Sequence, residues 1–106
     1  YSMVTLEAGA LVRTDVNTYG FSGFLVPESN IQPVRNDHTA YVVPEGKTLI
    51  INNSHGSVVI YVKEENSDVN RAFSPCIYGR YIIAKSGSTI TTNSSSYGWM
   101  GYLRDN

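Results

Sequence analysis

The chain has 106 residues, a formal net charge of −1 and a single cysteine. This length fits one domain with one hydrophobic core and leaves no room for a second domain. Lys and Arg are scattered singly along the chain, which excludes the basic patch of a nucleic-acid binder and a polybasic membrane anchor. No apolar run approaches the roughly 20 residues that a bilayer-spanning helix needs, and the first residues lack the pattern of a signal peptide.

The residue types and their punctuation predict an all-β chain. Val, Ile and Tyr are abundant, and turn residues recur at intervals of about 8 to 12 positions, the spacing of a sandwich or barrel. No window has the periodicity of a helix. We expect a single domain over residues 1–106. Strands are expected near residues 3–6, 10–13, 22–26, 39–43, 47–52, 57–63, 79–84, 88–92 and 97–103.

Two stretches of the chain share one outline. "VPEGKTLIINN" begins at Val43 and "AKSGSTITTNS" begins at Ala84, and each has Gly (Gly46, Gly87), then Thr, an aliphatic residue and Asn. We predict that each stretch is a hairpin turn with its glycine at positive φ, followed by a polar loop and a third strand. Two such units stacked face to face would form an antiparallel β-sandwich or jelly roll. The alternative is chance, because Gly-x-Thr after a turn is common in all-β chains.

The expected strands are unusually apolar. A strand with one wet face alternates apolar and polar residues, yet "YVV", "LII", "VVIYV", "YIIA" and "WMGYL" are nearly continuous. Both faces of these strands are therefore expected to be covered, and a chain of this length cannot cover both faces of two sheets by itself. We favour association with further copies of the chain. The alternative is that loops cover the ends of the strands.

No catalytic or metal-binding constellation stands out, and we expect a non-enzymatic protein without cofactor or metal. His38 and His55 lie seventeen positions apart, without the close spacing of a zinc site, and there is no His-x-His pair. The carboxylates are scattered through candidate loops, without the spacing of a calcium loop or of a glycosidase pair. Cys76 has no base nearby in the sequence, and a free cysteine is most often a core residue.

Binding through aromatic side chains is the stronger possibility. Tyr and Trp carry a flat apolar surface with a polar edge, which suits stacking on sugars as well as packing at interfaces. We select Tyr78, Arg80, Tyr97 and Trp99 as candidate ligand-binding residues, with Arg80 able to grip a carboxylate or phosphate through two hydrogen bonds. For each of the three aromatic residues the alternative is a place in the core or in a subunit interface.

The later part of the chain resembles a known family. The Pro-Glu-Gly turn before "KTLIINN", the following "SVVIYV", the later Gly-Ser-Thr-Ile and the closing "YGWMGYLRDN" are similar to the C-terminal heads of bacteriophage fibres and tail needles. These heads are similar in turn to tumour-necrosis-factor-like trimeric jelly rolls. The resemblance covers roughly residues 39–106. It implies a trimeric knob of a virion appendage, which would be the C-terminal part of a longer fibrous protein. Such a knob binds a host surface glycan or receptor, or serves the injection of DNA.

The resemblance brings no catalytic residues with it. It implies instead that the last strand, with Tyr97, Trp99 and Tyr102 alternating with glycines, runs through the subunit interface. A second hypothesis is a monomeric carbohydrate-binding β-sandwich module of a secreted protein, which would use exposed aromatic residues as a sugar platform. The oligomeric state separates the two hypotheses.

Overall fold

The computed structural model describes residues 4–15, 17–18, 21–25, 31–36, 39–54, 58–73, 81–94 and 97–106. This part of the chain contains eight strands and no helix, which confirms the predicted all-β class. The strands are β1 (Ile31–Asn36), β2 (Tyr41–Val42), β3 (Lys47–Ser54), β4 (Ile60–Lys63), β5 (Asn70–Phe73), β6 (Ile82–Ala84), β7 (Thr89–Thr92) and β8 (Trp99–Asp105).

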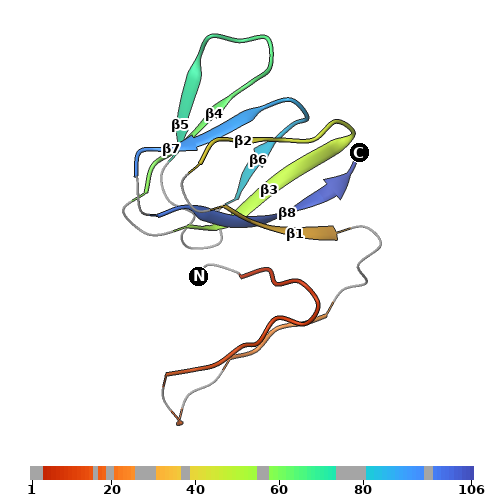
Figure 1. Ribbon diagram of the computed structural model, residues 1–106, viewed down its shortest axis with the longest axis vertical. Coiled ribbons are helices and arrows are strands. Elements are labelled where there is room, and N and C mark those ends of the chain that lie inside the picture. Colours follow the sequence, from red (N-terminus) through yellow and green to blue (C-terminus); the bar gives the residue numbers. More distant parts are fainter. Residues whose placement is uncertain are drawn as a thin grey trace.

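The strands form two four-stranded antiparallel sheets (Figure 1). Sheet A has the order β1-β8-β3-β6, and sheet B has the order β2-β7-β4-β5. One hydrophobic cluster draws on both sheets, with Leu49, Ile51 and Leu103 from sheet A and Ile60 and Ile90 from sheet B. Full burial of each such side chain stabilises the fold by about 1.5–3 kcal/mol. The arrangement is consistent with a β-sandwich whose core lies between the sheets.

The pairing of the strands follows a nested order along the chain. β4 pairs with β5, β3 with β6, β2 with β7 and β1 with β8, so the chain folds back on itself at the β4–β5 connection. The pairs β3–β8 and β4–β7 then join these ribbons into sheets. The two halves of the ribbon cross together from one sheet to the other, because β2 and β7 lie in sheet B while β3 and β6 lie in sheet A.

The two repeated turns lie at this crossing. Gly46 and Gly87 have φ angles of 78° and 83°, which confirms the prediction of positive φ at both glycines. The prediction of two hairpins is wrong, because β2 and β3 belong to different sheets, as do β6 and β7. Each turn bends its half of the ribbon around the same corner. The turns lie side by side there, since the Val43 amide donates to the Ser88 carbonyl and the Gly87 amide to the Val43 carbonyl, both at 2.9 Å.

The repeat is also visible in the register of the central strands. Tyr61 of β4 pairs with Thr91 of β7. The residue 41 positions after Tyr61 is Tyr102, the residue 41 positions before Thr91 is Ile50, and these two also pair, between β8 and β3. A shift of 41 residues, the spacing from Gly46 to Gly87, therefore converts one central pairing into the other. The strands of the two copies interleave in both sheets, so the expectation of two units stacked face to face is wrong.

The structure changes the expected strands at the edges and in the first part of the chain. Residues 31–36 and 70–73 form strands that were not predicted. Both are outermost strands with one neighbour each, so Pro33 in β1 costs no ladder hydrogen bond on its open side. The described residues of the expected strands 3–6, 10–13 and 22–26 form no strand. Their β-propensity is not sufficient, because a strand needs a neighbour that accepts its backbone hydrogen bonds.

The described residues between positions 4 and 25 lie outside both sheets and extend away from the sandwich, and we call them the arm (Figure 1). The described residues of this segment are almost all exposed. The radius of gyration is 14.4 Å, compared with about 13 Å for a compact domain of this length. The chain therefore consists of a sandwich with an arm that has no core of its own.

Candidate functional site

The face of sheet A that points away from sheet B carries a row of apolar residues across all four strands. The register places Ile83 of β6 opposite Ile50 of β3, Ile50 opposite Tyr102 of β8, and Tyr102 opposite Pro33 of β1. Residues directly opposite in adjacent strands have their Cβ atoms about 4.5–5.5 Å apart, so these four side chains form one continuous line. We call these four residues the outer row.

The outer row points away from the core because its chain neighbours point into the core. Ile82, Ile51 and Leu103 belong to the core cluster, and side chains alternate between the two faces of a strand. Ile50 is buried but lies outside that cluster, as expected for a residue of the opposite face. The apolar run "YIIA" therefore supplies both faces of β6, which is the pattern that indicated a second covered surface.

Exposure along the outer row is lowest at Ile50 of β3 and highest at Ile83 of β6. Ile50 is 8% exposed, whereas Ile83 is 70% exposed, and Tyr81, two positions before Ile83 along the same chain segment, is half exposed. An isoleucine is among the residue types most often buried completely, so a mostly exposed one next to an exposed tyrosine is informative. In the single chain, this end of the outer face is an uncovered apolar surface.

A β-bulge connects the outer face to the arm. The register between β3 and β8 shifts between Ile51 and Asn53, which leaves Asn52 as the extra residue of β3. The side-chain amide of Asn52 donates to the Thr5 hydroxyl at 2.7 Å. Asn52 is almost completely buried, and its side-chain oxygen has no hydrogen-bond partner. The start of the arm is therefore attached to sheet A at the bulge.

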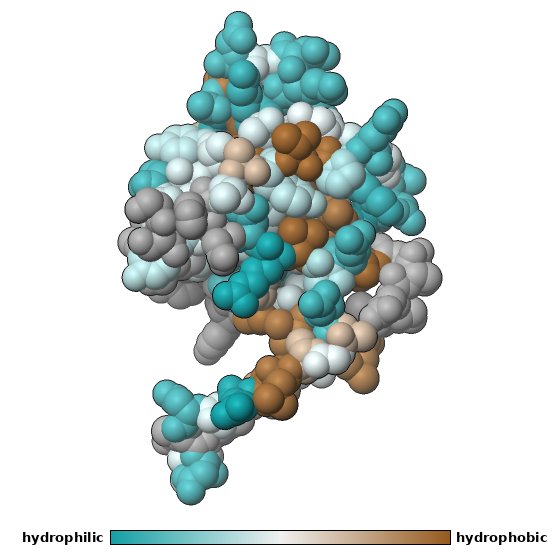
Figure 2. Space-filling model, in the orientation of Figure 1, coloured by the Kyte–Doolittle hydropathy of each residue, from teal (hydrophilic) through white to brown (hydrophobic). Residues whose placement is uncertain are grey.

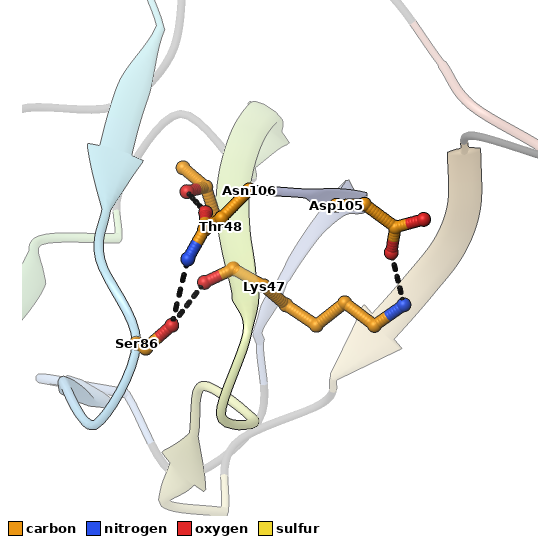
Figure 3. A network of polar contacts seen from close by, with 5 residues as sticks. All are labelled: Lys47, Thr48, Ser86, Asp105 and Asn106. Atoms are coloured by element: carbon orange, nitrogen blue, oxygen red, sulfur yellow. Dashed lines mark hydrogen bonds and ion pairs between the residues drawn. The ribbon is translucent and has the colours of Figure 1, made fainter.

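A polar network surrounds the end of β8 (Figure 3). Lys47 forms an ion pair with Asp105, and the Thr48 hydroxyl donates to the Asn106 side chain. The Ser86 hydroxyl donates to the Lys47 carbonyl at 2.6 Å. The backbone amide of Asn106 donates to the Gly46 carbonyl at 3.0 Å. The network ties the last strand to the two repeated turns. Its charges neutralise each other, and it has no unpaired group directed at a ligand, so its role is structural.

Of the four predicted ligand-binding residues, the described part of the chain contains Tyr97 and Trp99. Tyr78 and Arg80 lie outside the described residues, as do Cys76, His38 and His55. Tyr97 is 48% exposed, and Trp99 is 3% exposed. The Trp99 ring packs edge-to-face on Tyr41, with ring centroids 5.3 Å apart. Trp99 thus takes the core position that the sequence left open as its alternative, while ligand binding by Tyr78, Arg80 and Tyr97 stays a prediction.

The described residues contain no group of three His, Cys, Asp or Glu side chains that could hold a metal ion. Burial raises the pKa of the Tyr41 phenol above its ordinary value, and its ring packs against the core at Trp99. No helix long and apolar enough to cross a membrane is found in the same residues. The exposed apolar end of the outer face of sheet A, at Ile83 and Tyr81, is the surface feature that we consider for function.

The sequence contained a sign of this surface but not its location. The runs "LII", "YIIA" and "WMGYL" indicated a second apolar face. Only the register shows that Ile50, Ile83 and Tyr102 line up in one row. A comparison of the chain with family models, with curated proteins and with solved structures finds no match.

Proposed function

We propose that this chain is a non-enzymatic homotrimeric head domain of a bacteriophage tail appendage, a fibre or a tail needle. The head resides in the virion and contributes to binding of the bacterial surface, through a glycan or receptor, or to the machinery of DNA injection. The observation that carries the proposal is the outer row of sheet A, an apolar surface that ends in the mostly exposed Ile83. A surface of this kind on a small domain marks an interaction site.

A jelly-roll fold is part of the proposal. An eight-stranded jelly roll arises when an antiparallel ribbon, with nested pairs of strands, rolls into two four-stranded sheets. The pairs β1–β8, β2–β7, β3–β6 and β4–β5 and the orders β1-β8-β3-β6 and β2-β7-β4-β5 support this topology. The sequence resemblance to phage heads and to trimeric jelly rolls supports the same fold.

Trimerisation through sheet A agrees with the chemistry of its outer face. β8 crosses the middle of this sheet, between β1 and β3, and presents Met100 and Tyr102 on the side opposite Trp99 and Leu103. Burial of such side chains between copies would be favourable by about 25 cal/mol for each Å² of apolar surface. The last strand therefore contributes one face to the core and the other to the proposed interface.

The test is the mass of the native protein. Sedimentation equilibrium or multi-angle light scattering at micromolar concentration should give about three times the chain mass of 11.7 kDa. Ile83→Lys should shift the protein toward the monomer, because a charge at an exposed apolar site resists burial between copies. The substitution should leave the fold intact, since surface changes usually alter stability by less than about 0.5 kcal/mol.

Val69→Lys is the matched control. Val69 is about as exposed as Ile83 but lies in the β4–β5 connection, at the far end of sheet B. This variant should retain the mass of the wild type. A monomeric wild type refutes the proposal, and a monomer that binds on a glycan array supports the carbohydrate-binding module instead. A protein that stays trimeric after Ile83→Lys would contradict an interface on the outer face of sheet A.

A further inference from the structure

The arm formed by residues 4–25 is apolar without being packed. Seven of its described side chains are large hydrophobic residues that are each at least 43% exposed, and Leu25 is fully exposed. These residues are Val4, Leu6, Leu11, Val12, Phe21, Phe24 and Leu25. Figure 2 shows hydrophobic side chains on the part of the arm next to the sandwich and hydrophilic ones at the end that lies farthest from it. An exposed segment of this composition is not typical of a free solvated loop, which is polar.

We propose that the arm of each copy binds the outer face of sheet A on a neighbouring copy, so that the assembled protein is held together by exchanged arms. The inference rests on the proposed self-association and names the segment that carries it. The occupant is a second copy of this chain, since the same chain carries both an apolar arm without a core and an apolar sheet face whose end at Ile83 and Tyr81 is exposed.

The attachment of the arm supports an exchange on this face. Thr5 is hydrogen-bonded to Asn52, so the arm starts on the side of sheet A that points away from sheet B (Figure 1). β1, which follows the arm in the chain, is an outermost strand of the same sheet. The start of the arm is therefore held on sheet A at Thr5, and a neighbour that associates through this sheet would lie within reach of the arm.

The arm supplies part of the area that a stable interface needs. A Val, Leu or Phe side chain carries roughly 100 Å² of apolar surface. Seven such side chains that are about two-thirds exposed would bury on the order of 400–500 Å² against a neighbour. In a ring of copies each interface contains one arm on one acceptor face, so this is also the area per partner. It is about half of the roughly 800 Å² per partner of a standard interface, and contacts between the sheets would supply the rest.

The charge of the arm is compatible with this binding mode. The charged residues of its described part are Glu7, Arg13 and Asp15, with none between Phe21 and Leu25. Residues 21–25 can therefore lie on Ile83 and Tyr81 of a neighbour without burial of a charge, while the exposed Glu7, Arg13 and Asp15 remain in water. The uncharged residues 21–25 are therefore the part of the arm proposed to bind, and the charged positions are proposed to stay in water.

The first experiment locates the arm in the full-length assembly. Phe24 is replaced by the photo-crosslinking analogue p-benzoylphenylalanine in a 15N-labelled chain, which is co-assembled with unlabelled wild type and irradiated. We expect labelled arm peptides joined to unlabelled peptides that contain residues 81–84 or 99–104. Crosslinks only within the labelled chain, or to other surfaces of a neighbour, would overturn the inference.

The second experiment measures the contribution of the arm to assembly. The triple variant Phe21→Ser, Phe24→Ser, Leu25→Ser removes three exposed side chains that belong to no core, so the sandwich should fold as in wild type. Its dissociation constant should rise by about 1000-fold, or about 4 kcal/mol at 1.4 kcal/mol for each factor of ten. Far-UV circular dichroism checks the fold of the dissociated variant.

A triple variant with changes elsewhere on the arm is the control. Glu7→Ser, Arg13→Ser and Thr18→Ser alter the same arm at exposed polar positions, and the assembly should tolerate them. If the Phe21, Phe24, Leu25 variant assembles as well as this control, the inference is wrong while the proposed trimer stands. A monomeric wild type would overturn both the inference and the proposed function.

Discussion

Replacement of Trp99 by alanine tests the packing of the sandwich at its largest side chain. The indole is 3% exposed and packs edge-to-face on Tyr41, with an interplanar angle of 81°. Truncation of a buried Trp to Ala costs about 3–5 kcal/mol, and the lost aromatic pair accounts for about 0.5–1.5 kcal/mol. The expected loss of about 3–5 kcal/mol is a large part of the about 5–15 kcal/mol that keeps a domain folded.

One detail separates the contribution of volume from that of hydrogen bonding. The indole nitrogen is buried and has no hydrogen-bond partner. Trp99→Phe removes this unsatisfied donor, whose burial costs about 1–3 kcal/mol, while most of the ring surface remains. We therefore expect Trp99→Phe to cost less than about 1.5 kcal/mol, far less than Trp99→Ala.

Urea unfolding followed by far-UV circular dichroism measures these differences at one fixed protein concentration, because self-association would add to the apparent stability. Tyr97→Ala is the comparison, since Tyr97 lies two positions away and is half exposed. It should cost less than about 1 kcal/mol. Equal losses for Trp99→Ala and Tyr97→Ala would refute the buried position of the indole.

Three further predictions concern the turns, β8 and Tyr41. Gly46→Val and Gly87→Val should each cost about 1–2 kcal/mol in urea unfolding, because both φ angles are positive, and Gly87→Val should cost more because its Cβ would lie 2.5 Å from the Glu65 carboxylate. Asn should be tolerated better than Val at both positions, and a larger loss for Asn than for Val contradicts this. Gly101→Ala should cost about 3 kcal/mol or more, since its Cβ would lie 2.2 Å from a backbone carbonyl oxygen of β3; a normal melting temperature contradicts it. Burial raises the pKa of Tyr41, so the folded protein keeps a proton that the unfolded chain releases above pH of about 10. Stability should be constant below that pH and decrease above it, and Tyr41→Phe should remove this decrease in the urea midpoint.

The sequence by itself determined the local features of this protein. The β class follows from residue types, and the positive φ of Gly46 and Gly87 follows from turns that other residues enter only with strain. Most of the predicted strands after residue 39 also formed, because their β-branched and aromatic residues fit a pleated, half-buried surface. The apolar runs indicated a second apolar face, which the structure presents as the outer row.

Only the tertiary structure decided which strands meet. The two similar turns bend a ribbon around a corner and do not close hairpins, because β2 pairs with β7 and β3 pairs with β6, far along the chain. Trp99 and Ile83 both lie in apolar runs, yet Trp99 is a core residue and Ile83 is exposed. The pairing of β3 with β8 and with β6 places them on opposite faces of sheet A. A strand's own sequence specifies alternation between two faces, while the partner strands decide which face meets the core.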